Sequence, residues 1–141
     1  MADLPVIPQP EEAQLAANRA RIQKARKLIT GLLRLDTEEN GALSGFYEDY
    51  YLQIDFSEAH PLLMLSLAKP FYVPMNINMY RALNRVNLNS ILGSHTVNGD
   101  VGCYSFRLTQ WLFSDLTADQ VRMLLDRAVA ETEKGIRTIS L

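Results

Sequence analysis

The chain has 141 residues, of which 48% are hydrophobic and 21% are charged. These proportions are typical of a folded globular protein and exclude disordered, collagen-like and membrane compositions. The formal net charge of −2 gives no global positive field, so nucleic acid is not expected as a partner. A single cysteine, no run of 18 apolar residues and no basic, apolar leader predict a cytoplasmic protein without a transmembrane segment.

The N-terminal region divides into an arm and a helix. Three prolines among residues 1–10 block helix formation and predict a flexible N-terminal arm. From Glu11 onward apolar residues recur at spacings of three, four or seven, which predicts an amphipathic helix of about 23 residues. The polar segment 36–41 ends this helix. Because no repeat or linker divides the remainder, residues 11–141 are expected to form a single α+β domain.

Three strands are predicted next, over residues 43–47, 50–56 and 62–68. In the second of them Tyr50, Leu52 and Ile54 alternate with Tyr51, Gln53 and Asp55, which is the period of two of a strand with one buried face. The third is a nearly continuous apolar run between two prolines, which favours an interior strand. Short links between these strands predict an antiparallel meander.

A second helix is predicted over residues 76–87. Ile77, Tyr80 and Leu83 share one of its faces. Four asparagines weaken its intrinsic helix propensity, so its stability must come from packing.

A hairpin and a last helix complete the predicted fold. The pair Asn98-Gly99 predicts a tight turn between strands over 91–97 and 101–111. Thr117 and Gln120 have the spacing of a capping box that opens the last helix, and Gly135 is expected to end it. The expected class is α+β in the order α-β-β-β-α-β-β-α, with an antiparallel five-stranded sheet and helices packed on one side.

No set of residues has the spacing of a catalytic, cofactor-binding or metal-binding site. His60 and His95 have no second histidine or cysteine at metal-ligand spacing. In an alternating strand Cys103 is expected to behave as a small apolar residue and not as a nucleophile served by His95. Phosphate-binding and hydrolase motifs do not occur in the sequence. We therefore expect no enzyme activity, no cofactor and no metal.

The first predicted helix is basic and carries Arg19, Lys24 and Arg26 with no acidic residue between them. Such a helix is able to attract nucleic acid or an anionic membrane surface. It is also the solvated side of any helix whose apolar stripe meets a sheet. We favour the second interpretation, because the net charge is slightly negative and the helix has no aromatic residue to stack on bases.

Aromatic residues are concentrated in the predicted meander and in the last strand. Tyr47, Tyr51 and Trp111 are candidate anchors for a partner, since strand alternation allows each to point away from the core. Aromatic residues are enriched where proteins bind one another.

Two sequence motifs point to a known family. The segment Leu83-Asn84-Arg85-Val86-Asn87 and the segment Leu116-Thr117-Ala118-Asp119-Gln120 flank the hairpin, and this arrangement resembles the YbjN family of bacterial proteins. The predicted element order is similar to that of type III secretion chaperones. The resemblance implies a regulator of sensory transduction without catalytic residues. The related chaperones are homodimers that hold extended segments of a client protein.

We therefore expect a non-enzymatic protein-binding module, a regulator or chaperone-like protein acting as a homodimer on another protein or peptide segment. One alternative is a regulator that meets nucleic acid or an anionic membrane through the basic first helix. Another is a small-molecule sensor with a pocket beneath the second helix.

Overall fold

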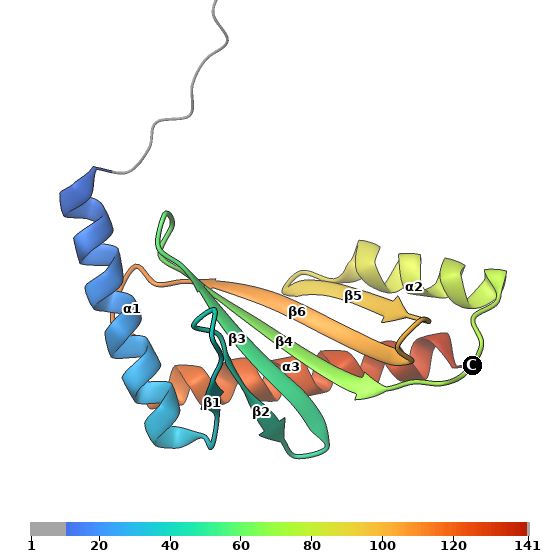
Figure 1. The fold of residues 1–141 in the computed structure, drawn as a ribbon. Coiled ribbons are helices and arrows are strands. Elements are labelled where there is room, and N and C mark those ends of the chain that lie inside the picture. The colour runs from blue at the N-terminus through green and yellow to red at the C-terminus, as the bar shows by residue number, and fades with distance from the viewer. Residues whose placement is uncertain (1–10, 141) are drawn as a thin grey trace, which may run out of the picture.

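The computed structural model describes residues 11–140, and the predicted arm over residues 1–10 lies outside them. Three helices and six strands follow in chain order (Figure 1). They are α1 (Glu12–Leu32), β1 (Asp36–Thr37), β2 (Leu43–Tyr47), β3 (Tyr50–Ser57), β4 (Leu62–Pro70), α2 (Ile77–Asn89), β5 (Gly93–Asn98), β6 (Cys103–Trp111) and α3 (Ala118–Ile139).

The strands form one antiparallel sheet in the order β1-β2-β3-β4-β6-β5. All three helices pack on one face, which we call the covered face, as the sequence predicts. Figure 1 shows α3 running along the sheet, α1 at the end that holds β1, and α2 beside β5. Among residues 11–140 no helix lies on the other face, which we call the open face.

The core lies between the helices and the covered face. Its strand residues come from β2, β3, β4 and β6 and are Leu43, Tyr50, Leu52, Ile54, Leu63, Leu65, Leu67, Phe106 and Leu108. Buried side chains of α1 and α3 pack on them. A second cluster joins Met79 and Ala82 of α2 to Tyr104 and Ile139. Each large apolar side chain buried in this way contributes about 1.5–3 kcal/mol to folding.

The sheet has six strands, so the predicted number of five is wrong. The additional strand β1 lies in the polar segment that the sequence predicts as a loop, where Asp36 pairs with Ser44 and Thr37 with Leu43. Backbone groups alone make this pairing, so it leaves no apolar pattern in the sequence. Gly41, with φ of 87°, turns the chain back into β2.

The hairpin between β5 and β6 is wider than the two-residue turn predicted at Asn98-Gly99. Asn98 pairs with Cys103, so four residues form the loop. The Asn98 side chain accepts a hydrogen bond from the Asp100 amide at 3.1 Å, and Gly102 takes a positive φ of 63°. The turn signal was therefore placed correctly, but the glycine that reverses the chain is the second one.

Gly135 does not end α3, which continues to Ile139. It is buried inside the helix, where a Cβ would lie 1.9 Å from the Tyr104 hydroxyl oxygen and 2.7 Å from His95 Nδ1. The glycine is therefore required by the close approach of α3 to the sheet and not by a helix end. The predicted capping box is confirmed, with reciprocal hydrogen bonds between Thr117 and Gln120.

Asn87, the second asparagine of the motif in α2, binds the free edge of β5. Its Nδ2 donates to the His95 carbonyl at 2.9 Å, and its Oδ1 accepts from the His95 amide at 2.7 Å. One side-chain amide thus takes the place of a neighbouring strand. This contact blocks part of an edge that would otherwise pair with other chains.

Candidate interaction surfaces

The open face carries exposed aromatic side chains at both ends of the sheet. Phe46 is 77% exposed and meets Tyr51, itself 40% exposed, edge to face at 5.9 Å between ring centroids. At the other end Trp111 stacks on Phe113 at 5.2 Å and meets His60 at 6.2 Å. Aromatic groups that are held in place and remain in water are typical anchors of protein interfaces.

A shallow hollow of about 260 Å³ lies beside the first aromatic pair. Phe46, Tyr51, Tyr72 and Val101 are among its lining residues. Tyr72 and Val101 are largely exposed, so the hollow and the pair form one apolar area at this end of the open face. The hollow has room for one or two side chains of a partner, and not for a buried small ligand.

The structure places two of the three predicted aromatic anchors on the open face. Tyr51 and Trp111 lie there, whereas Tyr47 does not. Tyr47 pairs directly with the buried Tyr50, and residues opposite one another in a ladder share a face. Tyr47 therefore packs at the margin of the core, where burial and the nearby carboxylates of Glu48 and Asp126 raise its pKa.

The cations of α1 that the sequence singles out each contact a group within the chain. Arg19 Nε lies 2.9 Å from a carboxylate oxygen of Glu58, and Lys24 Nζ lies 3.3 Å from one of Asp115. Arg26 donates a hydrogen bond to a backbone carbonyl, and its guanidinium lies 4.9 Å from the centre of the Phe56 ring. These contacts fix α1 to the β3–β4 turn, to the loop before α3 and to β3.

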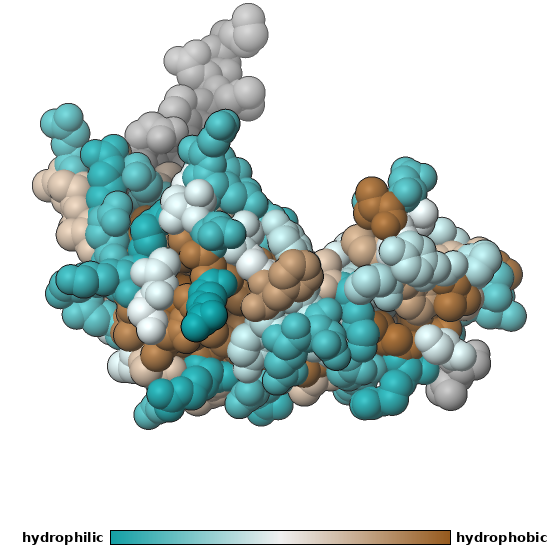
Figure 2. All heavy atoms as spheres, turned by 60° about the horizontal axis from the view of Figure 1, so that its bottom comes forward, coloured by the Kyte–Doolittle hydropathy of each residue, from teal (hydrophilic) through white to brown (hydrophobic). Residues whose placement is uncertain are grey.

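The outer face of α2 and the residues just after it carry a stripe of exposed apolar side chains. Ile77 is 63% exposed, Tyr80 53%, Leu88 76% and Ile91, just beyond the helix, 96%. They lie four and seven residues on either side of Asn84, so the pattern is symmetric about that residue. We call these four residues and Asn84 the α2 stripe. Apolar side chains also gather on the right of Figure 2, over the end that holds α2 and the end of α3.

The residues that packing does use on α2 lie on its other side. Met79 and Ala82 are buried, and Leu83 and Val86 are partly buried against the second core cluster. Of the three residues that the sequence places on one face of this helix, Leu83 packs on the core, whereas Ile77 and Tyr80 are exposed. Because α2 is apolar on two sides, periodicity alone did not separate the side that meets the sheet from the side that meets solvent.

The one buried histidine belongs to a structural cluster. His95 Nδ1 is 2.7 Å from the Tyr104 hydroxyl, and its Nε2 is 3.5 Å from a carboxylate oxygen of Glu131. Burial lowers the pKa of His95, and the nearby Glu131 carboxylate opposes that effect. Cys103 belongs to the open face while His95 lies on the covered face, so the sheet separates the two.

A second, partly buried network joins β3 and β4 to α3. The Tyr50 hydroxyl hydrogen-bonds the Glu133 carboxylate, which Lys69 Nζ also approaches to 3.0 Å. These two contacts lower the pKa of Glu133, and burial with the same hydrogen bond raises that of Tyr50. The arrangement fixes the helix to the sheet.

Two further observations concern the described part of the chain. Within residues 11–140 no three histidine, cysteine or acidic side chains are grouped so as to hold a metal ion. No helix there has the length and apolar character that a membrane crossing requires.

The fold defines the class: a mixed α+β domain of the type III secretion chaperone kind. The structure of the Yersinia pestis chaperone SycH with a fragment of YscM2 has a TM-score of 0.56 and 14% identity, covering 84% of this chain and 98% of that one. The chaperone–effector complex HopA1–SchA has a TM-score of 0.53 and 12% identity, covering 94% and 99%. At such identities the similarity is one of fold.

The sequence identifies the family more closely. Residues 30–140 match the YbjN family, described as "Putative bacterial sensory transduction regulator", and the chain belongs to this family. YbjN from E. coli, described as "a putative transcription regulator", has a similar structure, with a TM-score of 0.53 and 12% identity over 84% of this chain and 87% of that one. No curated protein sequence matches the chain.

Proposed function

We propose that this protein is a non-enzymatic binding module that holds a segment of another protein on the open face of its sheet. The observation that carries the proposal is the exposure of ordered aromatic rings on that face, at Phe46, Tyr51 and Trp111. Burying such rings in a partner's side chains supplies most of the energy of a typical interface. The aromatic ends, with mixed polar residues between them, suit an extended segment better than a compact domain.

The structural neighbours support this proposal. SycH and the HopA1–SchA chaperone were each solved with a protein partner. The histidine and cysteine that nucleophilic catalysis would need lie on opposite faces of this sheet. We therefore propose that the open face binds its partner through the shape and apolar surface of its side chains.

Affinity capture from native extract, followed by mass spectrometry, tests the proposal. Wild-type protein and the double variant Tyr51→Ser and Trp111→Ser are compared, with Tyr47→Phe on the covered face as the matched control. Proteins bound to the wild type and the control but lost from the double variant are the expected result. A partner retained by the double variant would place binding elsewhere.

We further propose that the protein acts as a homodimer joined through the α2 stripe. In a twofold contact between antiparallel helices, residue i meets residue j and j meets i. Centred on Asn84, this operation brings Ile77 against the partner's Ile91 and Tyr80 against the partner's Leu88. The stripe is its own complement, which supports a second copy over an unrelated occupant.

Sedimentation equilibrium tests the homodimer. The double variant Leu88→Glu and Ile91→Glu is expected to sediment as a monomer, because it places four carboxylates in the contact. Met123→Glu, at an exposed position of α3, is the control and should leave the dimer intact. A wild-type monomer at about 100 μM, well above the Kd of a stable dimer, would disprove this part of the proposal.

Binding of nucleic acid or an anionic membrane through α1 has less support. Arg19, Lys24 and Arg26 already contact Glu58, Asp115 and a backbone carbonyl. Exposed pairs of this kind are weak, but they reduce the free positive charge that α1 presents.

A further inference from the structure

A groove runs between α2 and the C-terminal half of α3. Three hollows of about 550, 370 and 340 Å³ lie along it. Arg85 and Thr138 line both the first and the second hollow, and Asn89, Glu131 and Lys134 line both the second and the third. The hollows are therefore one continuous groove. Helix α2, which borders the groove, has 13 residues and spans about 20 Å, the length of about six residues of extended chain.

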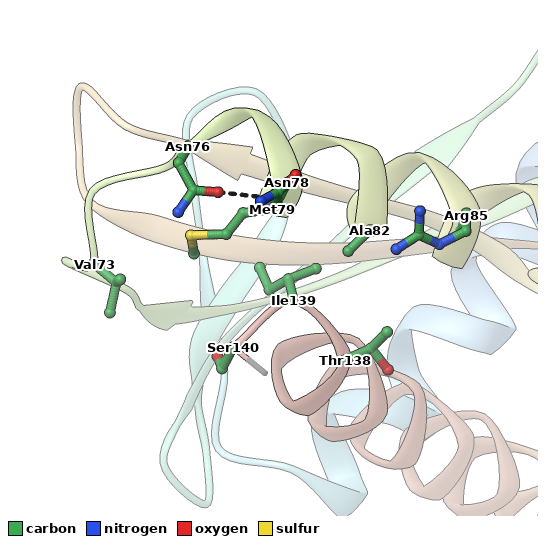
Figure 3. Close-up of a pocket in the computed structure, with 9 residues that line it drawn as sticks. All are labelled: Val73, Asn76, Asn78, Met79, Ala82, Arg85, Thr138, Ile139 and Ser140. Carbon is green, nitrogen blue, oxygen red and sulfur yellow. Dashed lines mark hydrogen bonds between the residues drawn. The ribbon is translucent and has the colours of Figure 1, made fainter.

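The floor of the first hollow is apolar and its rim is polar. Figure 3 shows the first hollow, with Met79 and Ala82 of α2 facing Ile139 of α3 across the floor. Asn76 and Arg85 lie on the α2 side of the rim. This combination suits a chain whose side chains alternate between apolar and polar.

The groove carries an excess of positive charge. Arg85, Arg127 and Lys134 line it, against the single carboxylate of Glu131. Within residues 11–140 none of these three cations forms an ion pair. The Glu131 carboxylate lies instead beside the buried Nε2 of His95, at 3.5 Å. A ligand with negative charge would therefore find cations that no group in the described chain neutralises.

Two asparagines on the rim each use one polar group of the side-chain amide within the chain and leave the other free to hydrogen-bond a ligand. Asn76 Oδ1 accepts from the Met79 amide at 2.9 Å, which leaves its NH₂ group as a donor. Asn89 Nδ2 donates to the Arg85 carbonyl at 2.9 Å, which leaves its oxygen as an acceptor. A donor near one end of the groove and an acceptor near the other match the backbone of an extended peptide.

We propose that this groove binds an extended, acidic segment of a partner protein, with Arg85 and Lys134 binding its carboxylates. Nucleic acid fits less well because no aromatic side chain lines the groove for base stacking. A small anion fits less well because the groove is long and open along its side. The inference goes beyond the proposed function, since the groove is on the helix side of the molecule, away from the open face, and meets the α2 stripe at Ile91 of its third hollow.

A fluorescein-labelled peptide of four Asp-Val repeats, read by fluorescence anisotropy on the full chain, tests the inference. Saturable binding that weakens at least tenfold between about 50 and about 500 mM NaCl is expected for a charge-driven contact. The double variant Arg85→Glu and Lys134→Glu should weaken binding by at least about tenfold. Amide chemical shifts of residues 85–89 and 131–138 should move on titration.

The matched control is Arg107→Glu, which makes the same kind of charge change at an exposed position of the open face. It should alter peptide affinity less than about twofold. No saturable binding, or equal loss in the control, would overturn the inference. Tighter binding to a dodecamer of thymidylate or to free glutarate, lost in the double variant, would also overturn it by assigning the groove to nucleic acid or to a small anion. Because Tyr51 and Trp111 are intact in the double variant Arg85→Glu and Lys134→Glu, loss of peptide binding in that variant leaves the proposal for the open face untouched.

Discussion

The same strands form both faces of the sheet, yet the side chains of the covered face are buried in the core and many of those on the open face are exposed to solvent. On β6, Phe106 points to the covered face and is fully buried, while Arg107 and Trp111 point to the open face and are exposed. On the covered face packing decides which residue fits. On the open face the side chains are in contact with water and not with the core, so a side chain there contributes little to the stability of the fold. The comparison teaches that stability and binding can be changed independently in this protein.

Two phenylalanines offer the sharpest test of this difference. Phe106→Ala should destabilise the protein by about 4 kcal/mol, because it leaves a cavity in the core. Phe46→Ala, at a site 77% exposed, should cost less than about 1 kcal/mol. Urea unfolding followed by circular dichroism measures both. Similar losses for the two variants would mean that the open face is covered in solution.

Two helical glycines extend the comparison to the helices. Gly135→Ala should destabilise by about 2–3 kcal/mol, because the new methyl group meets Tyr104 and His95 in a packed site. Gly31→Ala, where a Cβ meets nothing within 4 Å, should stabilise by about 0.5–1 kcal/mol through helix propensity. Thermal unfolding measures the sign of each change. A stabilising Gly135→Ala would show that α3 does not approach the sheet so closely.

The two asparagines of the α2 motif should behave differently. Asn87→Ala removes both hydrogen bonds to His95 of β5 and should cost about 2 kcal/mol. Asn84→Ala, at an exposed position, should change the stability of the monomer by less than about 0.5 kcal/mol. Hydrogen exchange at the His95 amide provides a local readout, and it should accelerate only in the first variant.

The smallest expected effect is a pH dependence from His95. Burial lowers its pKa in the folded state, so below the ordinary value of about 6.5 the unfolded chain binds more protons. Stability should therefore fall as pH drops from 7 toward 5, by no more than about 1.4 kcal/mol per pH unit. Of the charged groups facing His95, Glu131 opposes this loss and Lys134 adds to it.

The measurement is urea unfolding at pH 7.5, 6.5 and 5.5. His95→Gln should flatten this dependence, while His60→Gln, at an exposed site, should not. The pKa of Glu133 is also lowered, but its contribution is lost only as pH falls below the ordinary carboxyl range, so the two windows are separate. An unchanged slope in His95→Gln would mean that His95 stays accessible to protons in the folded state.

The sequence by itself determined the class, the order of the long elements and the family. Strand alternation in β3 and the capping box of α3 are local signals, written in residues that are close together in the chain. The end of the last helix was predicted wrongly at Gly135, because the reason for this glycine is its contact with Tyr104 and His95, which are far away in the sequence. Strand alternation predicted that Tyr51 and Trp111 point away from the core, and both lie on the open face, whereas for Tyr47 only the register with Tyr50 determined the face.

Tertiary structure alone decided the surfaces. Strand β1 forms by backbone pairing with β2, so no side-chain pattern in the sequence predicts it. Helix α2 has apolar residues on two sides, and only the position of the sheet decides which side forms the α2 stripe. The groove lies between two helices that are separated by 28 residues of chain, and its charges meet because packing brings the helices together. Local chemistry fixes each element, but the neighbours of an element fix which of its side chains remain free to bind.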